Sequence, residues 1–313
     1  MKPTKEHLTL FGSLLVDSIL DFRQIGHTAK LGYRAVCRVI RGPGDWEPGQ
    51  GIDETGHEIN DAEIVFAVHI FFPEYVERLR TVVGNFPRST FLITASSYEV
   101  EAEILDLFRP TGTQFEVRVV PNIGRNFGPT FVEYSEQIEK FPIMIHLHSK
   151  RTSYISGVTA ASWANRAWAL LGENRALTLR ALSVIESAPN INLVSADVSD
   201  LISPLNFRWG VNRAAGKKLL KRLSMPKATL TRGQILFPVG GMFLARTSAL
   251  SALLKGDLQY KDFPQESGQR DGTTHHALER LIGTLCSLEG GRQFLYVEHR
   301  DVFSEDSSFL YRQ

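Results

Sequence analysis

The sequence of 313 residues is poor in cysteine and contains no long apolar run. Its two cysteines, Cys37 and Cys286, lie far apart and match no metal-knuckle or redox pattern, which favours a reducing compartment and two separate thiols. No run of about 18 apolar residues is present, so we expect no transmembrane helix. The N-terminus lacks the features of a signal peptide. We therefore expect a cytoplasmic protein, with peripheral attachment at the inner membrane as an open alternative.

The chain has almost no net charge, but one segment lacks acidic residues. The formal net charge of +1 argues against a nucleic-acid partner. Residues 201–256 contain no Asp or Glu, whereas ten Lys and Arg residues occur there. This imbalance favours an anionic partner, such as a phosphate, a nucleotide or a lipid surface, and a solvated helix face is the alternative.

Composition divides the chain into three parts. Residues 1–43 carry seven Lys and Arg against three Asp and Glu, with apolar positions at helical spacing. They predict a basic helical extension that either packs on the domain or lies on anionic lipid. Residues 44–62 are acidic, contain Gly and Pro, and predict a linker. Residues 63–313 form the main domain.

In the main domain, short apolar runs alternate with helical patterns. Strands are predicted at 64–72, 90–94, 115–120, 143–148, 191–195, 235–245 and 293–297, and helices at 73–83, 98–108, 127–141, 162–187 and 273–286. This alternation predicts an α/β fold with a mostly parallel central sheet and helices on both faces. Because such sheets bind ligands at the carboxyl ends of their strands, the residues after each strand are the candidates for function.

The loop after the third predicted strand is suited to an anion. It reads Pro121-Asn-Ile-Gly-Arg-Asn-Phe-Gly-Pro129 and supplies Asn122, Arg125 and Asn126 just before a helix. Backbone amides at a helix N-terminus, together with an arginine, are typical of an anion site. The alternative is a loop that only caps the helix.

The fourth predicted strand ends in two histidines and two cations. Strand periodicity places His146 and His148 on one face, and Lys150 and Arg151 follow. The pattern favours a cationic site for a pyrophosphate leaving group or a His-x-His metal site. An imidazole hydrogen-bonded in the core is a third alternative.

Two later segments add candidates. Gly240 and Gly241 interrupt an apolar run, which indicates the close approach of a ligand or of a packed helix. The segment 266–280 begins a helix at which Asp271 is predicted as the cap. This segment also supplies candidate general bases within a few turns, namely Glu266, Asp271, His275 and Glu279.

Together these segments resemble the rhamnan-synthesis F family of bacterial polysaccharide glycosyltransferases. The matching motifs occur in order at 68–73 (Val-His-Ile-Phe-Phe-Pro), 122–129 (Asn-Ile-Gly-Arg-Asn-Phe-Gly-Pro), 146–151 (His-Leu-His-Ser-Lys-Arg), 209–212 (Trp-Gly-Val-Asn), 240–246 (Gly-Gly-Met-Phe-Leu-Ala-Arg) and 271–280. The chain departs from the family at Asn126, where an Asp is usual, and at His146, where a Lys is expected.

The resemblance implies transfer of a sugar, rhamnose or a related one, from a nucleotide-diphosphate donor to a lipid-linked, growing surface polysaccharide or O-antigen. It also implies a GT-A-like nucleotide-diphospho-sugar transferase fold. No Asp-x-Asp triplet follows any predicted strand, so no metal clamp is assigned. Mn²⁺ or Mg²⁺ stays an open alternative, with Asp197 and Asp200 as a weak substitute.

On this interpretation, cations neutralise the leaving diphosphate and a carboxylate deprotonates the acceptor hydroxyl. We predict Asp271 as the base, with Glu266 second. The predicted donor- and phosphate-binding residues are Asn122, Arg125, Asn126, His146, His148, Lys150 and Arg151. The predicted supporting residues are Gly240, Gly241, His275, Glu279 and Arg280.

Two other functions remain open on the sequence alone. One is a metal-dependent hydrolase that uses His146, His148, His275 and His276, which tightly bound metal would reveal. The other is a non-catalytic binding module of a glycan-assembly complex, which binds but does not turn over. The basic segment 213–223 is also a candidate for contact with the lipid-pyrophosphate carrier of the acceptor.

Overall fold

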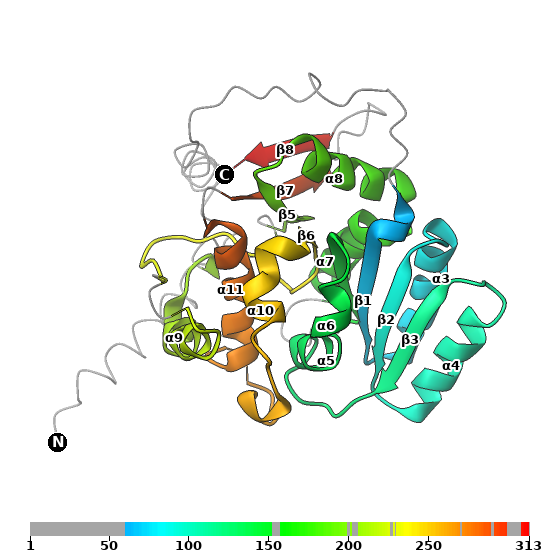
Figure 1. Ribbon diagram of the computed structural model, residues 1–313, viewed down its shortest axis with the longest axis horizontal. Coiled ribbons are helices and arrows are strands. Elements are labelled where there is room, and N and C mark those ends of the chain that lie inside the picture. Colours follow the sequence, from blue (N-terminus) through cyan, green and yellow to red (C-terminus); the bar gives the residue numbers. More distant parts are fainter. Residues whose placement is uncertain are drawn as a thin grey trace. The chain divides into compact units, whose positions relative to one another are not determined.

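The computed structural model describes residues 60–151, 157–198, 201, 206–225, 228, 230–269, 271–288, 291–298 and 308–312 (Figure 1). The predicted helical extension 1–43, and the predicted linker 44–62 apart from its last residues, lie outside the described residues. The three-part division of the chain therefore stays a prediction.

The described residues form an eight-stranded sheet in the order β3-β2-β1-β4-β6-β5-β7-β8. Strands β3, β2, β1 and β4 pair in parallel, and so do β5 and β7. Strand β6 is antiparallel to both of its neighbours, and β8 is antiparallel to β7. The strands are β1 (Ile64–Ile70), β2 (Thr90–Ala95), β3 (Gln114–Val119), β4 (Ile143–His148), β5 (Ile191–Ala196), β6 (Phe243–Arg246), β7 (Arg292–Glu298) and β8 (Ser308–Arg312).

Helices cover both faces of the sheet (Figure 1). One apolar core contains residues of α3, α4, α7 and α8, and a second contains residues of α5, α6, α9, α10 and α11. This arrangement confirms the predicted α/β architecture with a mostly parallel sheet. The helices are α3 (Val76–Asn85), α4 (Tyr98–Phe108), α5 (Phe127–Glu133), α6 (Ser135–Ile138), α7 (Gly157–Trp168), α8 (Arg175–Ser187), α9 (Arg213–Arg222), α10 (Ser251–Leu254) and α11 (Thr274–Cys286).

The central strands explain why the sheet is so evident in the sequence. Every residue of β1 is buried, because helices cover both of its sides, and all of its residues except His69 are accordingly apolar. In the parallel register, His69 of β1 lies opposite His148 of β4. The carboxyl ends of these two strands therefore lie side by side.

Strand β6 is shorter than predicted. It spans Phe243–Arg246 instead of 235–245, because Gly240 and Gly241 take up φ angles of +87° and +79°, which end the extended conformation. Since β6 runs antiparallel to β4, the turn that precedes it lies at the carboxyl end of β4. The glycine pair is therefore part of the same sheet edge as the other candidate residues.

Two helix predictions were also wrong in detail. The predicted helix 162–187 is divided into α7 and α8 by a π-helical turn at Ala169–Glu173, in which Gly172 leaves helical geometry. Asp271 is not the cap of α11, whose N-cap residue is Thr273. No helix in the described part of the chain combines the length and the apolar character that crossing a bilayer requires.

Candidate functional site

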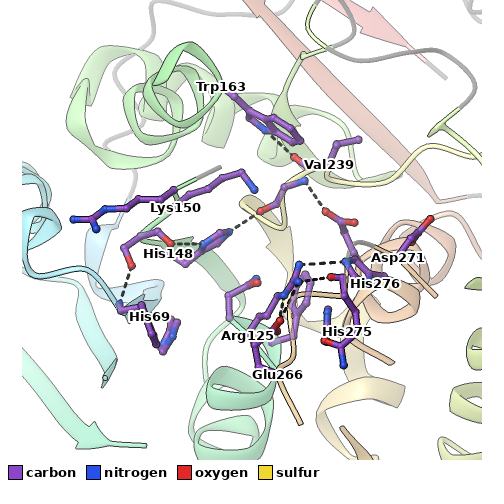
Figure 2. A pocket seen from close by; sticks show the side chains of 18 of the residues that line it. His69, Arg125, His148, Lys150, Trp163, Val239, Glu266, Asp271, His275 and His276 are labelled. Atoms are coloured by element: carbon purple, nitrogen blue, oxygen red, sulfur yellow. Dashed lines mark hydrogen bonds and ion pairs between the residues drawn. The ribbon is translucent and has the colours of Figure 1, made fainter. Parts of the chain in front are cut away.

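A cavity of about 650 Å³ opens at the carboxyl edge of β1 and β4. Figure 2 shows side chains from distant parts of the sequence converging on it. The loop after β3, the end of β4, the turn before β6 and the start of α11 all contribute to its lining. Every site residue predicted from the sequence lines this cavity except His146 and Gly241, which lie in the wall behind it.

Arg125 joins two loops of the cavity. Its guanidinium donates to both carboxylate oxygens of Glu266 at 2.9 and 3.3 Å, and to the carbonyl oxygen of Gln269 at 2.5 Å. A further nitrogen lies 3.2 Å from Nε2 of His276. Most of the donors of Arg125 are therefore already used within the protein.

The same contact fixes the protonation of His276. Because an arginine only donates, Nε2 of His276 accepts, and its Nδ1 carries the proton toward Thr273 Oγ1 at 2.8 Å. Burial and the Arg125 charge lower the pKa of His276 to about 4. The Arg125 hydrogen bonds also hold the pKa of Glu266 below its usual value. His276 is thus neutral, and Glu266 is ionised.

Lys150 differs from the other cations in the lining. Arg151 pairs with Glu74 at 2.7 Å on an exposed rim, and Arg280 pairs with two carboxylates. The ammonium of Lys150 lies 4.6 Å from the ring centroid of Trp163, and no described residue forms an ion pair with it. Burial lowers the pKa of Lys150. This cation is therefore available to a ligand.

The turn 238–241 is held on every side. The amide of Gly241 donates to the carbonyl of Pro238 at 2.8 Å. Four side chains bind four further backbone groups of residues 239–241: Trp163 donates to Val239 O (3.2 Å), His148 to Gly240 O (2.6 Å) and His146 to Gly241 O (2.5 Å), and Glu279 accepts from Gly240 N (2.6 Å). The turn is thus a fixed wall of the cavity.

Both glycines of this turn are required by their surroundings. A Cβ atom on Gly240 would lie 2.7 Å from Trp163 Nε1, and one on Gly241 would lie 2.7 Å from Asn126 Nδ2. Behind the turn, His146 is fully buried, and it also contacts Thr130 Oγ1 through Nε2 at 3.1 Å. Burial lowers its pKa to about 4, so it is a neutral, structural imidazole.

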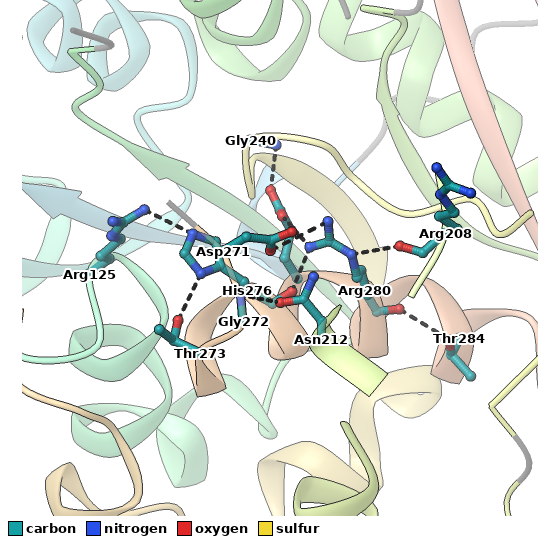
Figure 3. Close-up of polar contacts among 11 residues, drawn as sticks. Arg125, Arg208, Asn212, Gly240, Asp271, Gly272, Thr273, His276, Arg280 and Thr284 are labelled. Carbon is teal, nitrogen blue, oxygen red and sulfur yellow. Dashed lines mark hydrogen bonds and ion pairs between the residues drawn. The ribbon is translucent and has the colours of Figure 1, made fainter. Parts of the chain in front are cut away.

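Arg280 organises the acidic side of the cavity (Figure 3). Its guanidinium lies 3.5 Å from Glu279 and 3.8 Å from Asp271, and it donates to the carbonyl oxygen of Arg208 at 2.9 Å. Asn212 accepts from the amide of Gly272 at 2.9 Å and so fixes the segment that carries Asp271. One buried cation therefore lies beside two carboxylates and is closer to Glu279 than to Asp271.

Some lining residues were not predicted as site residues. His69 lies in the 68–73 motif near the end of β1, and its Nδ1 is 2.9 Å from Thr94 Oγ1. The usable signal was a polar residue close to the carboxyl end of a strand that is otherwise apolar. Trp163 lies inside a helix, where an aromatic residue is usually part of the core, so no sequence signal marked it. Its contact with Lys150 depends on how α7 packs over the strand ends.

The described residues do not present a metal site. No three His, Cys, Asp or Glu side chains among them are grouped closely enough to hold an ion, and Asp200 lies outside the described residues. Nitrogens of His146 and His148 already donate to the carbonyls of the turn 238–241. The geometry thus gives no support to a metal centre built on these two histidines.

Comparison with known proteins adds a family match. The model of a family described as rhamnan synthesis protein F matches residues 50–290. Two curated relatives, both named WxcX and described as uncharacterized, come from Xanthomonas campestris pv. campestris strains B100 and ATCC 33913. Each is 25% identical over 242 residues, which is 76% of this chain and 33% of the relative. The match therefore spans a third of the length of these relatives.

Proposed function

We propose a function from one premise: the chain belongs to the rhamnan synthesis protein F family. Membership supports a role in polysaccharide biosynthesis and, at a coarse level, glycosyl transfer. The proposed activity is transfer of rhamnose or a related sugar from a nucleotide-diphosphate donor to a growing surface polysaccharide or O-antigen. The proposed fold type is GT-A-like, which the parallel strands β3-β2-β1-β4 and the cavity at their carboxyl edge support.

The observation that carries the proposal is the state of Lys150. A diphosphate leaving group needs positive charge that is not already neutralised, and Lys150 is the cation of the described lining without a carboxylate at ion-pair distance. The ring of Trp163 lies beside the ammonium and neutralises none of its charge. We therefore place the donor diphosphate on Lys150, with Arg125 and Arg151 as secondary contacts.

Unsatisfied polar groups in the lining also support binding of a polar ligand. Nδ2 of Asn126 and both ring nitrogens of His275 are buried and have no partner among the described residues. Leaving such groups unpaired costs about 1–3 kcal/mol each, which a hydroxyl-rich or phosphate-bearing ligand offsets. Burial lowers the pKa of His275 to about 3, so its imidazole is neutral and has both a donor and an acceptor.

The acceptor and the location of the protein are further proposals. A lipid-linked glycan acceptor implies work at the cytoplasmic face of the inner membrane. Helix α9 presents exposed Lys217, Lys218 and Lys221, whereas Arg222 donates to the carbonyl of Gly256 at 2.8 Å. If neutralising the three lysines leaves co-sedimentation with anionic liposomes unchanged, this surface is not the membrane contact.

The first test is thermal stabilisation by dTDP, UDP and GDP, with and without Mn²⁺ and a chelator. A ligand at 100 times its dissociation constant stabilises the folded state by about 2.7 kcal/mol. Lys150→Ala removes a charge-assisted contact and is expected to weaken binding about 10- to 100-fold. Lys140→Ala is the matched control, because Lys140 is exposed and lies outside the cavity.

The outcomes separate the candidate functions. Loss of stabilisation in Lys150→Ala alone supports the assigned diphosphate site. Equal binding by Lys150→Ala, Lys140→Ala and the wild type contradicts it. Binding of a nucleotide sugar without release of the sugar supports a non-catalytic module instead of a transferase.

A further inference from the structure

We infer that Glu279 is the general base that takes the proton of the acceptor hydroxyl, instead of Asp271 or Glu266. The inference rests on the proposed glycosyl transfer and names the residue that carries out one of its steps. Three carboxylates line the cavity, and they differ in what already occupies their oxygens and in how firmly they are held.

The carboxylate oxygens of Glu266 have little capacity left to accept a further hydrogen bond. Its Oε2 accepts from Arg125 at 2.9 Å, and its Oε1 accepts both from Arg125 at 3.3 Å and from the amide of Gly268 at 2.9 Å. These hydrogen bonds favour the ionised form and lower its pKa, which weakens it as a base. Glu266 therefore serves to connect its own loop to the loop that carries Arg125.

The carboxylate of Asp271 is free to accept a proton, but few contacts hold it in place. Its side chain is 44% exposed, and its described contact is with Arg280 at 3.8 Å, beyond hydrogen-bond distance. A general base works when it is held within hydrogen-bond reach of the proton that it removes. A carboxylate at the solvent-exposed rim does not meet this requirement as well as one inside the cavity.

Glu279 is both held and free to react. Its side chain is 16% exposed, and Oε1 is fixed by the amide of Gly240 at 2.6 Å. Oε2 lies 3.5 Å from Arg280, at the limit of a hydrogen bond, and therefore keeps a lone pair for a substrate. The carboxylate extends from the first turns of α11 to a turn that Trp163, His148 and His146 also hold, so its position is set by rigid parts.

The electrostatic surroundings suit this role. Burial raises the pKa of Glu279, and the neighbouring Arg280 and Lys150 cations oppose that shift without cancelling it. A carboxylate with a raised pKa accepts a proton more readily than Glu266 does. Lys150 lies in the same cavity, so the site holds both a base and a cation for the leaving group.

The acceptor O–H bond breaks, its proton goes to Oε2 of Glu279, and the acceptor oxygen forms a bond to the anomeric carbon. The bond from that carbon to the phosphate oxygen breaks, and its electron pair leaves with the nucleoside diphosphate beside Lys150. Protonated Glu279 then returns its proton to water.

Substitutions can distinguish a purely structural role of Glu279 from a role as the general base. In Glu279→Gln the amide oxygen still accepts from Gly240, so the turn 238–241 is retained while the base is lost. Glu279→Asp keeps a carboxylate at a shorter reach. Asp271→Asn and Glu266→Gln are the matched variants at the other two carboxylates.

The experiment measures release of dTDP from dTDP-rhamnose, with methyl α-rhamnoside as acceptor, against pH. Glu279→Gln is expected to lower kcat by about 10²- to 10⁴-fold and to remove the acid limb of the kcat/KM profile. Its dTDP-induced thermal stabilisation is expected to match that of the wild type. Glu279→Asp retains the acid limb with partial activity, and the other two variants show smaller losses.

Activity of Glu279→Gln within tenfold of the wild type, or an acid limb that persists in it, overturns the inference while leaving the transferase proposal intact. A larger loss in Asp271→Asn, together with loss of the acid limb there, assigns the base to Asp271. A wild-type protein that binds no nucleotide and releases none from dTDP-, UDP- or GDP-sugars overturns both the inference and the proposed function.

Discussion

Gly241→Ala tests whether the turn 238–241 is the rigid wall that the geometry describes. Gly241 has a φ of +79°, and a Cβ there would lie 2.7 Å from Asn126 Nδ2 and 2.9 Å from Phe127 Cζ. Gly112 has a similar φ of +69°, but a Cβ on it would meet nothing within 4 Å. Gly112→Ala is therefore a matched control that changes the backbone preference alone.

The magnitudes follow from these contacts. A left-handed conformation costs an alanine roughly 1–2 kcal/mol, and both variants incur that cost. Gly241→Ala adds overpacking, which typically costs about 1–3 kcal/mol, because Phe127 and Asn126 are buried and the turn is bonded on every side. We expect the free energy of unfolding to fall by about 2–5 kcal/mol in Gly241→Ala and by about 1–2 kcal/mol in Gly112→Ala.

Urea unfolding with linear extrapolation measures both values, provided that the m-values agree. Because the turn contacts Asn126 and forms a wall of the cavity, Gly241→Ala should also reduce the thermal stabilisation of the protein by dTDP, UDP or GDP. Gly112→Ala should leave that stabilisation unchanged. Equal destabilisation of the two variants, or unchanged nucleotide binding in Gly241→Ala, would refute the description of the turn as tightly packed.

Three further results are expected. Burial lowers the pKa of His146 from 6.5 to about 4, so between these pH values the unfolded chain binds this proton more readily than the folded protein does. The resulting contribution to the free energy of unfolding is complete above pH 6.5 and is lost toward pH 4, at about 1.4 kcal/mol per pH unit. In His146→Gln, a plot of the free energy of unfolding against pH should therefore be less steep between pH 4 and pH 6.5. A double-mutant cycle on Arg125 and Glu266 should give a coupling of about 1 kcal/mol in urea unfolding, and a value near zero contradicts their bidentate contact. Gly84→Ala in α3 should raise the free energy of unfolding by about 0.4–1 kcal/mol, because a Cβ there meets nothing within 4 Å; destabilisation contradicts this.

The secondary structure was largely predictable because it depends on local patterns. Helix α4 and strand β4 have the predicted bounds, since their apolar periodicity is regular and their ends are abrupt. The alternation along the strand also predicted correctly that His146 and His148 share a face, because both bind the turn before β6. Where backbone conformation depends on packing, as at Gly240 and Gly241, the same patterns failed.

The edge of the sheet at which the candidate cavity lies also followed from the sequence. Parallel strands bring their carboxyl ends to one edge, so the polar residues after β3 and β4 had to lie at that edge. The order of motifs along the chain supported the family, and the family match over residues 50–290 agrees. The sequence therefore predicted which residue types line the cavity, but not how they are arranged.

Only the tertiary structure decided which of these groups are engaged and which are free. Arg125 and Glu266 are 141 residues apart in the sequence, and the packing of two loops brings them together as an ion pair. Most of their hydrogen-bonding groups are therefore already used within the protein. Lys150 forms no ion pair with any described residue, and the packing of α7 places the ring of Trp163 beside its ammonium. Ion pairing depends on distances of a few ångströms between elements far apart in sequence, and local periodicity carries no information on those distances.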